Sequence, residues 1–243
     1  MRVAALYDVH GNLPALEAVL EDVERESVDL VVVGGDVASG PMPAETLALL
    51  RALGKRVRFV RGNADRVLDF GGAGGDLELW MQSRLWVAER LGRDNLRFLA
   101  SLPLDVIVDV PALGPARFCH GAPGSDEETI TRVTPNDRLR RLLVSVEERV
   151  VVCGHTHVQF DRTVDGVRVI NAGSVGAPYE AEPGAYWLLL RPEIELRRTG
   201  YDAAEAVRQI RATGYPRAAE YVSELPVKDP GRPERMSRLI EGL

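Results

Sequence analysis

Residues 3–12 read VAALYDVHGN, an apolar run that leads directly into two chemically active side chains. The run at 3–6 has the length and composition of a buried strand, and Asp8 and His10 follow it with the spacing Asp-x-His. Polar motifs follow four further apolar runs in the same way, namely those at 30–33, 57–60 and 150–153 and the run that ends at residue 119. This repetition predicts buried strands that end in polar residues.

All four histidines of the chain fall within these motifs. The carboxyl ends of strands in an open α/β sheet meet at one crevice, so residues far apart in sequence can lie together there. Two aspartates, one asparagine and four histidines are then expected to converge. Their oxygen and imidazole donors suit a pair of divalent transition metals, and no thiolate favours a structural zinc. The motifs are Asp8-Val9-His10, Gly34-Gly35-Asp36, Gly62-Asn63, His120 and Gly154-His155-Thr156-His157.

The composition is that of an ordinary folded protein and excludes several functions. A chain of 243 residues can bury a full core as one α/β domain, or as one domain with an appendage. The net charge of −6 offers no basic stripe, so duplex nucleic acid is not an expected partner. No apolar run is long enough to span a bilayer and no signal peptide is visible, so we expect a cytoplasmic protein without a membrane partner. Cys119 and Cys153 are expected to be buried free thiols.

The order of the motifs resembles the signature of the calcineurin-like metallophosphoesterases, in particular a bacterial phosphodiesterase-like branch of that superfamily. The motifs run from Asp8 to His157, and the segment Asn171-Ala172-Gly173-Ser174 also looks like a family feature. The resemblance implies an α/β fold, a four-layer αββα sandwich in which two mixed β-sheets are flanked by helices.

Strand and helix patterns alternate through the first half of the chain, which favours a largely parallel inner sheet. Helices are expected at 13–26, at 44–53 and at 77–91 with a shorter one up to residue 99, and the Gly-rich stretch at 71–75 is expected to be flexible. In the second half, Asp165-Gly166 between two alternating runs predicts a hairpin. With strands at 185–191 and 194–198, this hairpin is expected to form a second, mixed or antiparallel sheet packed on the first.

The chain beyond residue 200 has helical patterns again. We expect residues 1–200 to form a metallophosphoesterase domain and residues 201–243 to form a C-terminal helical extension that packs on the same domain. Nothing in the sequence of this extension indicates chemistry.

The resemblance also implies how seven side chains would divide between two metal ions. Asp36 is the expected bridging ligand, and a metal-bridging hydroxide is the expected nucleophile. Mn²⁺ or Fe²⁺ is the expected metal, and Zn²⁺, Co²⁺ or Ni²⁺ is also compatible with these donors. One ion would take Asp8, His10, Asp36 and His157, and the other would take Asp36, Asn63, His120 and His155.

The chain departs from many relatives immediately after Asn63. In those relatives the Gly-Asn motif continues with a histidine that is thought to protonate the leaving group, whereas this chain has Ala64. Positioned proton transfer is typically worth about 10²–10⁴-fold in rate, so its loss favours leaving groups that need little protonation, such as aryl esters and anhydrides. We therefore expect a phosphodiesterase or nucleotide pyrophosphatase that acts on a small phosphorylated substrate, a nucleotide or dinucleotide among them. A phosphomonoesterase and a non-catalytic scaffold are the alternatives.

Three residues are candidates for contact with the substrate. Arg61 and Arg66 flank the Gly-Asn motif, and a planar guanidinium suits two-point contact with a phosphate. Either arginine, or bound water, could also replace the missing acid. Asn12 is placed either to orient the phosphate or to cap the helix that follows it. The expected catalytic residues are thus Asp36, Asn63, His120, Arg61 and Arg66.

Overall fold

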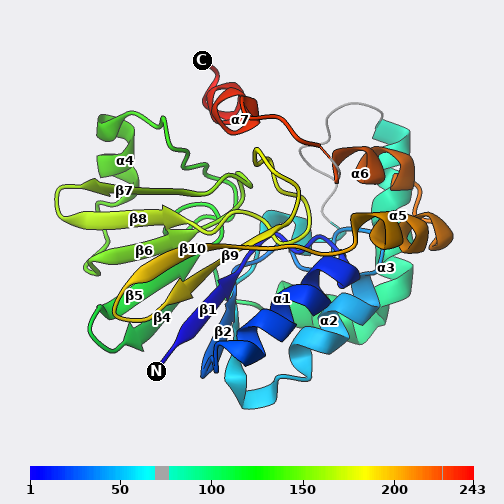
Figure 1. The fold of residues 1–243 in the computed structure, drawn as a ribbon, viewed down its shortest axis with the longest axis horizontal. Helices are drawn as coiled ribbons and strands as arrows, with labels where there is room; N and C mark the ends of the chain where they lie inside the picture. The colour runs from blue at the N-terminus through cyan, green and yellow to red at the C-terminus, as the bar shows by residue number, and fades with distance from the viewer. Residues whose placement is uncertain (69–76, 226) are drawn as a thin grey trace.

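Two β-sheets pack face to face in this protein, and helices cover their outer faces (Figure 1). The computed structural model describes residues 1–68, 77–225 and 227–243, so the Gly-rich stretch at 71–75 lies outside the described residues. Within the described chain each sheet has five strands. The αββα sandwich that the sequence predicts is therefore confirmed.

The first sheet contains the strands that carry the first three polar motifs. These strands run parallel to one another, and a hairpin from late in the chain adds two antiparallel strands beside them. Its members are β1 (Val3–Leu6), β2 (Leu30–Val33), β3 (Val57–Phe59), β9 (Ala185–Leu190) and β10 (Ile194–Thr199), in the spatial order β10-β9-β1-β2-β3.

The second sheet contains the strands that lead to the remaining motifs. Its members are β4 (Asp105–Val110), β5 (Gly114–Cys119), β6 (Val150–Cys153), β7 (Phe160–Val164) and β8 (Val167–Asn171), in the spatial order β4-β5-β6-β8-β7. β5, β6 and β8 are parallel, and the predicted hairpin at Asp165-Gly166 joins β7 to β8. Cys119 and Cys153, at the ends of β5 and β6, are buried free thiols.

The position of β9 and β10 corrects the sequence interpretation, which assigned both strands to the second sheet. β9 pairs with β1, and β10 pairs with β9, so both belong to the first sheet. All six residues of β9 are buried. Such an apolar run needs cover on both faces, but its composition does not specify which strand lies beside it.

Helices cover both outer faces. Their apolar residues recur at helical spacing, which gives each helix one apolar face that packs against a sheet. In the first helix, for example, the buried residues include Leu16, Val19 and Val23. Within the described ranges, no helix is both long and apolar enough to cross a bilayer. The first sheet is covered by α1 (Leu13–Arg25), α2 (Pro43–Arg51) and α3 (Leu77–Ala100), and the second by α4 (Asn136–Leu142).

Three helices follow β10, namely α5 (Ala203–Ala212), α6 (Ala218–Glu224) and α7 (Arg232–Glu241). α5 and α6 share an apolar cluster with Met42, which precedes α2; the cluster includes Ile210 and Val222. The C-terminal helices therefore contact the main fold. The proposed boundary at residue 200 stays a prediction.

The side chain of Tyr7 connects the two sheets. It is fully buried just beyond β1, and its hydroxyl donates a hydrogen bond to the carbonyl of Val152 in β6 at 3.0 Å. Two glycines make room for the ring, because a Cβ at Gly34 would lie 1.9 Å from a Tyr7 ring atom and a Cβ at Gly154 would lie 2.3 Å from another. Both glycines belong to polar motifs, so packing between the sheets positions the loops that carry those motifs.

We expect Gly34→Ala to destabilise the metal-free protein. The added methyl group overlaps the buried Tyr7 ring, and overpacking of this kind typically costs about 1–3 kcal/mol. Gly200→Ala is the matched control, because a Cβ there meets nothing within 4 Å, and its effect should stay below about 1 kcal/mol. Urea unfolding measures both values, and equal stability of the two variants would contradict this packing account.

Candidate metal centre

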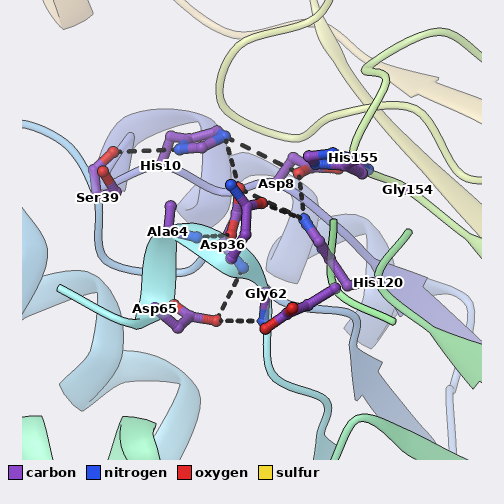
Figure 2. Close-up of polar contacts among 12 residues, drawn as sticks. Asp8, His10, Asp36, Ser39, Gly62, Ala64, Asp65, His120, Gly154 and His155 are labelled. Carbon is purple, nitrogen blue, oxygen red and sulfur yellow. Dashed lines mark hydrogen bonds and ion pairs between the residues drawn. The ribbon is translucent and has the colours of Figure 1, made fainter. Parts of the chain in front are cut away.

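The seven predicted ligands come together where strands of both sheets end. Figure 2 shows the side chains of His10, Asp36 and His120 pointing toward one another beside Asp8 and His155. Two groups of ligand atoms stand out among the described residues, and within each group all atoms lie within 4.8 Å of one another. The first group is Asp8, His10 and His157, and the second is Asp36, His120 and His155.

The Asp36 carboxylate belongs to the second group and also lies close to the first. Its Oδ2 atom is 3.7 Å from Nε2 of His10 in the first group and 3.5 Å from Nε2 of His120 in the second. Asn63 joins the second group, because its Oδ1 atom lies 3.1 Å from Nε2 of His120. A carboxylate in this position could contact two cations at once.

Backbone carbonyls fix the orientation of three of the imidazoles. Nδ1 of His10, His120 and His157 lies 3.2, 2.9 and 2.6 Å from the carbonyls of Ser39, Gly34 and Ala177, respectively. A carbonyl can only accept, so each Nδ1 carries a proton and each Nε2 faces the centre, where a neutral ring would offer its lone pair to a cation. A histidine that binds a metal through one ring nitrogen usually donates the N–H of the other to such an acceptor.

Several ligands have a backbone conformation that L-residues rarely adopt. Eight described non-glycine residues have positive φ, and five of them are predicted ligands. Surrounding hydrogen bonds hold these turns: the amide of His10 donates to the carbonyl of Asp36, and the hydroxyl of Ser174 donates to the carbonyl of Asp8. Such conformations persist where the fold over-determines them, often at functional sites. The five are Asp8 (53°), His10 (45°), Asp36 (52°), His155 (65°) and His157 (59°).

Asp8 and Asp36, the two predicted carboxylate ligands, each have one oxygen fixed by the backbone and one that faces the imidazoles. Oδ2 of Asp8 accepts from the amide of His155 at 2.8 Å, and Oδ1 of Asp36 accepts from the amide of Ala64 at 2.7 Å. Oδ1 of Asp8 is buried and has no hydrogen-bond partner among the described residues. A buried polar atom without a partner is costly, and a cation between the ligands would satisfy it. The residues present therefore fit a metal centre.

The charges of the ligands depend on one another. Burial opposes the ionised form of Asp36, but the neighbouring imidazoles, above all His120, hold the pKa of its carboxyl well below the usual range. Burial alone would lower the pKa of His120, but Asp36 and Asp8 raise it to about 10. His120 is thus protonated in the metal-free centre at neutral pH. Because metal ligands must be deprotonated, cation binding should release this proton.

Asp65 is a functional residue that the sequence reasoning missed. Its Oδ2 atom accepts hydrogen bonds from the amides of Asp36 and Gly62, both at 2.9 Å, and its Oδ1 atom accepts from the amide of Val37 at 3.0 Å. Burial, with the nearby Asp36, raises the pKa of Asp65 to about 7. The Asp65 side chain thus links the loop that carries Asp36 to the loop that carries Asn63. Asp65 lies three residues after Gly62, which is the spacing of a helix capping box. This spacing is the feature of the sequence that could have identified Asp65.

The two arginines predicted as phosphate clamps contact the loop that follows β5. Arg61 Nε donates to Oδ2 of Asp126 at 3.1 Å, and Arg66 Nε lies 3.4 Å from the same oxygen. Arg66 also pairs with Glu127. A phosphate would have to compete with these carboxylates for the guanidinium groups, and the clamp role stays a prediction.

Asn12 is fully buried beneath the centre. Its Oδ1 atom accepts from the amide of Ala15 and caps α1, while its Nδ2 atom lies 3.0 Å from the carbonyl of Gly176 and 3.3 Å from the hydroxyl of Tyr201. Both ends of the amide are thus engaged inside the protein. This arrangement favours the capping interpretation over contact with a substrate.

The chain belongs to the calcineurin-like phosphoesterase superfamily, since residues 1–191 match the model of that superfamily's domain. The predicted family is thereby confirmed, and with it the class of enzyme, a metal-dependent hydrolase of phosphate esters. The predicted ligand roles stay predictions.

Similar proteins span most of this chain. "Uncharacterized protein MJ0912" of Methanocaldococcus jannaschii is 27% identical over 233 residues, which cover 86% of this chain and 91% of the relative. "Phosphodiesterase YfcE" of Escherichia coli K12 is 26% identical over 201 residues, which cover 78% and 87%. The crystal structure of a metallophosphoesterase from Sphaerobacter thermophilus superimposes with a TM-score of 0.75 at 26% identity, covering 92% of this chain and 98% of the other.

We expect Asp65→Asn to weaken metal binding although Asp65 is not itself a predicted ligand. An asparagine amide offers one accepting oxygen in place of two, so at least one of the three backbone hydrogen bonds is lost and the anchor between the loops that carry Asp36 and Asn63 is weakened. Loss of a residue that orients ligands typically costs about 10–100-fold in metal affinity. Titration with Mn²⁺ measures the change, and Asp109→Asn, at an exposed position on β4, is the control. Equal Mn²⁺ affinity of the two variants would show that Asp65 does not position the site.

Proposed function

We propose that this protein is a two-metal phosphodiesterase or nucleotide pyrophosphatase that acts on small phosphorylated substrates. The observation that supports it is the position of Asp36 Oδ2, within 3.7 Å of an imidazole nitrogen of each of the two ligand groups. Two adjacent sites that share a carboxylate are typical of enzymes that hydrolyse phosphate esters by in-line displacement. The phosphodiesterase among the relatives is consistent with this activity.

The proposed ligand sets follow the two groups, with Asp36 common to both. Neutral Asn63 adds a donor without adding negative charge to a site that must admit a phosphate. Mn²⁺ or Fe²⁺ is the proposed metal, and when bound the pair would lower the pKa of a water nucleophile and neutralise charge on the phosphoryl group. The first ion would contact Asp8, His10, Asp36 and His157, and the second Asp36, Asn63, His120 and His155.

The residue that follows Asn63 favours diesters and anhydrides with good leaving groups. Ala64 donates its backbone amide to Asp36, but its methyl side chain cannot transfer a proton. A phosphate ester whose leaving group must be protonated would therefore react slowly unless Arg61, Arg66 or water supplies the proton. A phosphomonoesterase is the second candidate, because nothing in the ligand geometry itself excludes a monoester.

The test is hydrolysis of bis(p-nitrophenyl) phosphate against p-nitrophenyl phosphate by Mn²⁺-loaded protein. We expect a higher kcat/KM for the diester, and we expect Asp36→Asn to lower it by at least about 100-fold because both ions lose a ligand. Asp109→Asn serves as the control with an unchanged site. Preference for the monoester would favour the phosphomonoesterase, whereas inactivity toward both substrates with metals bound would favour the scaffold.

A further inference from the structure

A cavity of 790 Å³ opens beside the first ligand group. His10 and His157 line part of it, and residues of α6 and α7, together with Leu225 and Val227, line another part. Small-molecule sites typically have volumes of about 300–1,000 Å³, and a phosphoryl group alone would fill a small part of this space. The cavity can therefore hold a second part of the substrate.

The C-terminal helices are attached directly to the ligand-bearing loops. The Tyr221 hydroxyl, on α6, lies 3.1 Å from the carbonyl of His10 and 3.0 Å from the carbonyl of Gly176, and its single proton is available to either. The Tyr179 ring stacks on the His157 ring, with centroids 5.1 Å apart and an angle of 24° between the planes. The guanidinium of Arg232, on α7, lies 5.1 Å from the Tyr179 ring centroid. Aromatic surface thus continues from the ligand group into the cavity.

Each of the three arginines that line the cavity is paired with a carboxylate. Among the described lining residues, Arg217 pairs with Glu220 at 2.7 Å, and Arg232 pairs with Glu224. Arg235 pairs at 2.6 Å with Asp229, which is not itself a lining residue. An excess of arginine would suit further phosphates, whereas paired donors and acceptors around tyrosine rings suit a planar group with polar edges and hydroxyls. A base with its ribose has this chemistry.

We propose that the C-terminal helices form a subsite for the nucleoside arm of a phosphodiester whose phosphoryl group lies at the ligand groups. This inference rests on the proposed function and extends it, because it gives residues 201–243 a role in substrate choice. The base would lie among the tyrosines that line the cavity, Tyr179, Tyr215 and Tyr221, and the ion pairs would meet its edges and the ribose hydroxyls. The sequence of the extension alone could not reveal this role, because only the folded chain places these residues beside the ligand groups.

The test compares two substrates that share a leaving group and differ in the other arm. These are the p-nitrophenyl ester of thymidine 5′-monophosphate and methyl p-nitrophenyl phosphate, with Mn²⁺-loaded full-length protein. Ser223 is exposed on α6 and lines the cavity, so the indole of Ser223→Trp would occupy part of it. We expect the wild type to hydrolyse the thymidine ester with the higher kcat/KM. Stacking of a base is worth roughly tenfold or more in binding, so the ratio of the two kcat/KM values should fall at least about tenfold in Ser223→Trp.

Ser145→Trp is the matched control, because Ser145 is exposed and lies outside the residues that line the cavity. It should leave the ratio of the two kcat/KM values within about twofold of wild type. Binding of thymidine 5′-monophosphate, followed by saturation transfer from protein to its base protons, gives a readout independent of turnover. Ser223→Trp should lose this transfer, and Ser145→Trp should keep it.

The outcomes separate the subsite from the proposed function. If Ser223→Trp hydrolyses both esters with the wild-type ratio of kcat/KM values, the subsite is overturned and the phosphodiesterase remains. The same holds if both kcat/KM values fall by an equal factor. Absence of hydrolysis by the metal-loaded wild type would overturn the proposed function and the subsite that rests on it. A lower ratio together with lost saturation transfer, in Ser223→Trp alone, would establish the subsite.

Discussion

The structure depends on holding two buried carboxylates and four imidazoles in one crevice. Asp8 and Asp36 are both almost inaccessible to solvent, and like charges buried together require compensation. Protonated His120 supplies part of it in the metal-free protein, and cations would supply more. Five of the seven predicted ligands also have left-handed backbone conformations, which cost free energy and persist where the surrounding structure over-determines them.

The sandwich supplies the rigidity that such turns require. Motif-bearing loops leave both sheets, so the centre holds its shape only if the sheets keep their relative position. Tyr7 joins them through the Val152 carbonyl, and Gly34 and Gly154 admit its ring. Asp65 then ties two loops of the first sheet together. Packing and polar contacts therefore converge on the same few loops.

Local patterns in the sequence indicated the strands and the motif order, because both depend on neighbouring residues. The convergence of the ligands followed from the general rule that strand ends meet at one crevice. No such rule covered the other contacts between distant segments. The apolar run of β9 gave no sign of its pairing with β1, and the burial that makes Asp65 an anchor exists only in the folded chain. Tyr221 reaches the carbonyl of His10 from 211 residues away, so the sequence of α6 alone suggested only packing.

The central claim is that these side chains form a centre for two metal ions with Asp36 between them. Anomalous scattering from crystals grown with Mn²⁺ tests it most directly. We predict two peaks, about 3.5–4 Å apart, one beside His10 and His157 and one beside His120 and His155, with the Asp36 carboxylate in contact with both. A single peak, or none, at these residues in an intact fold would contradict the account.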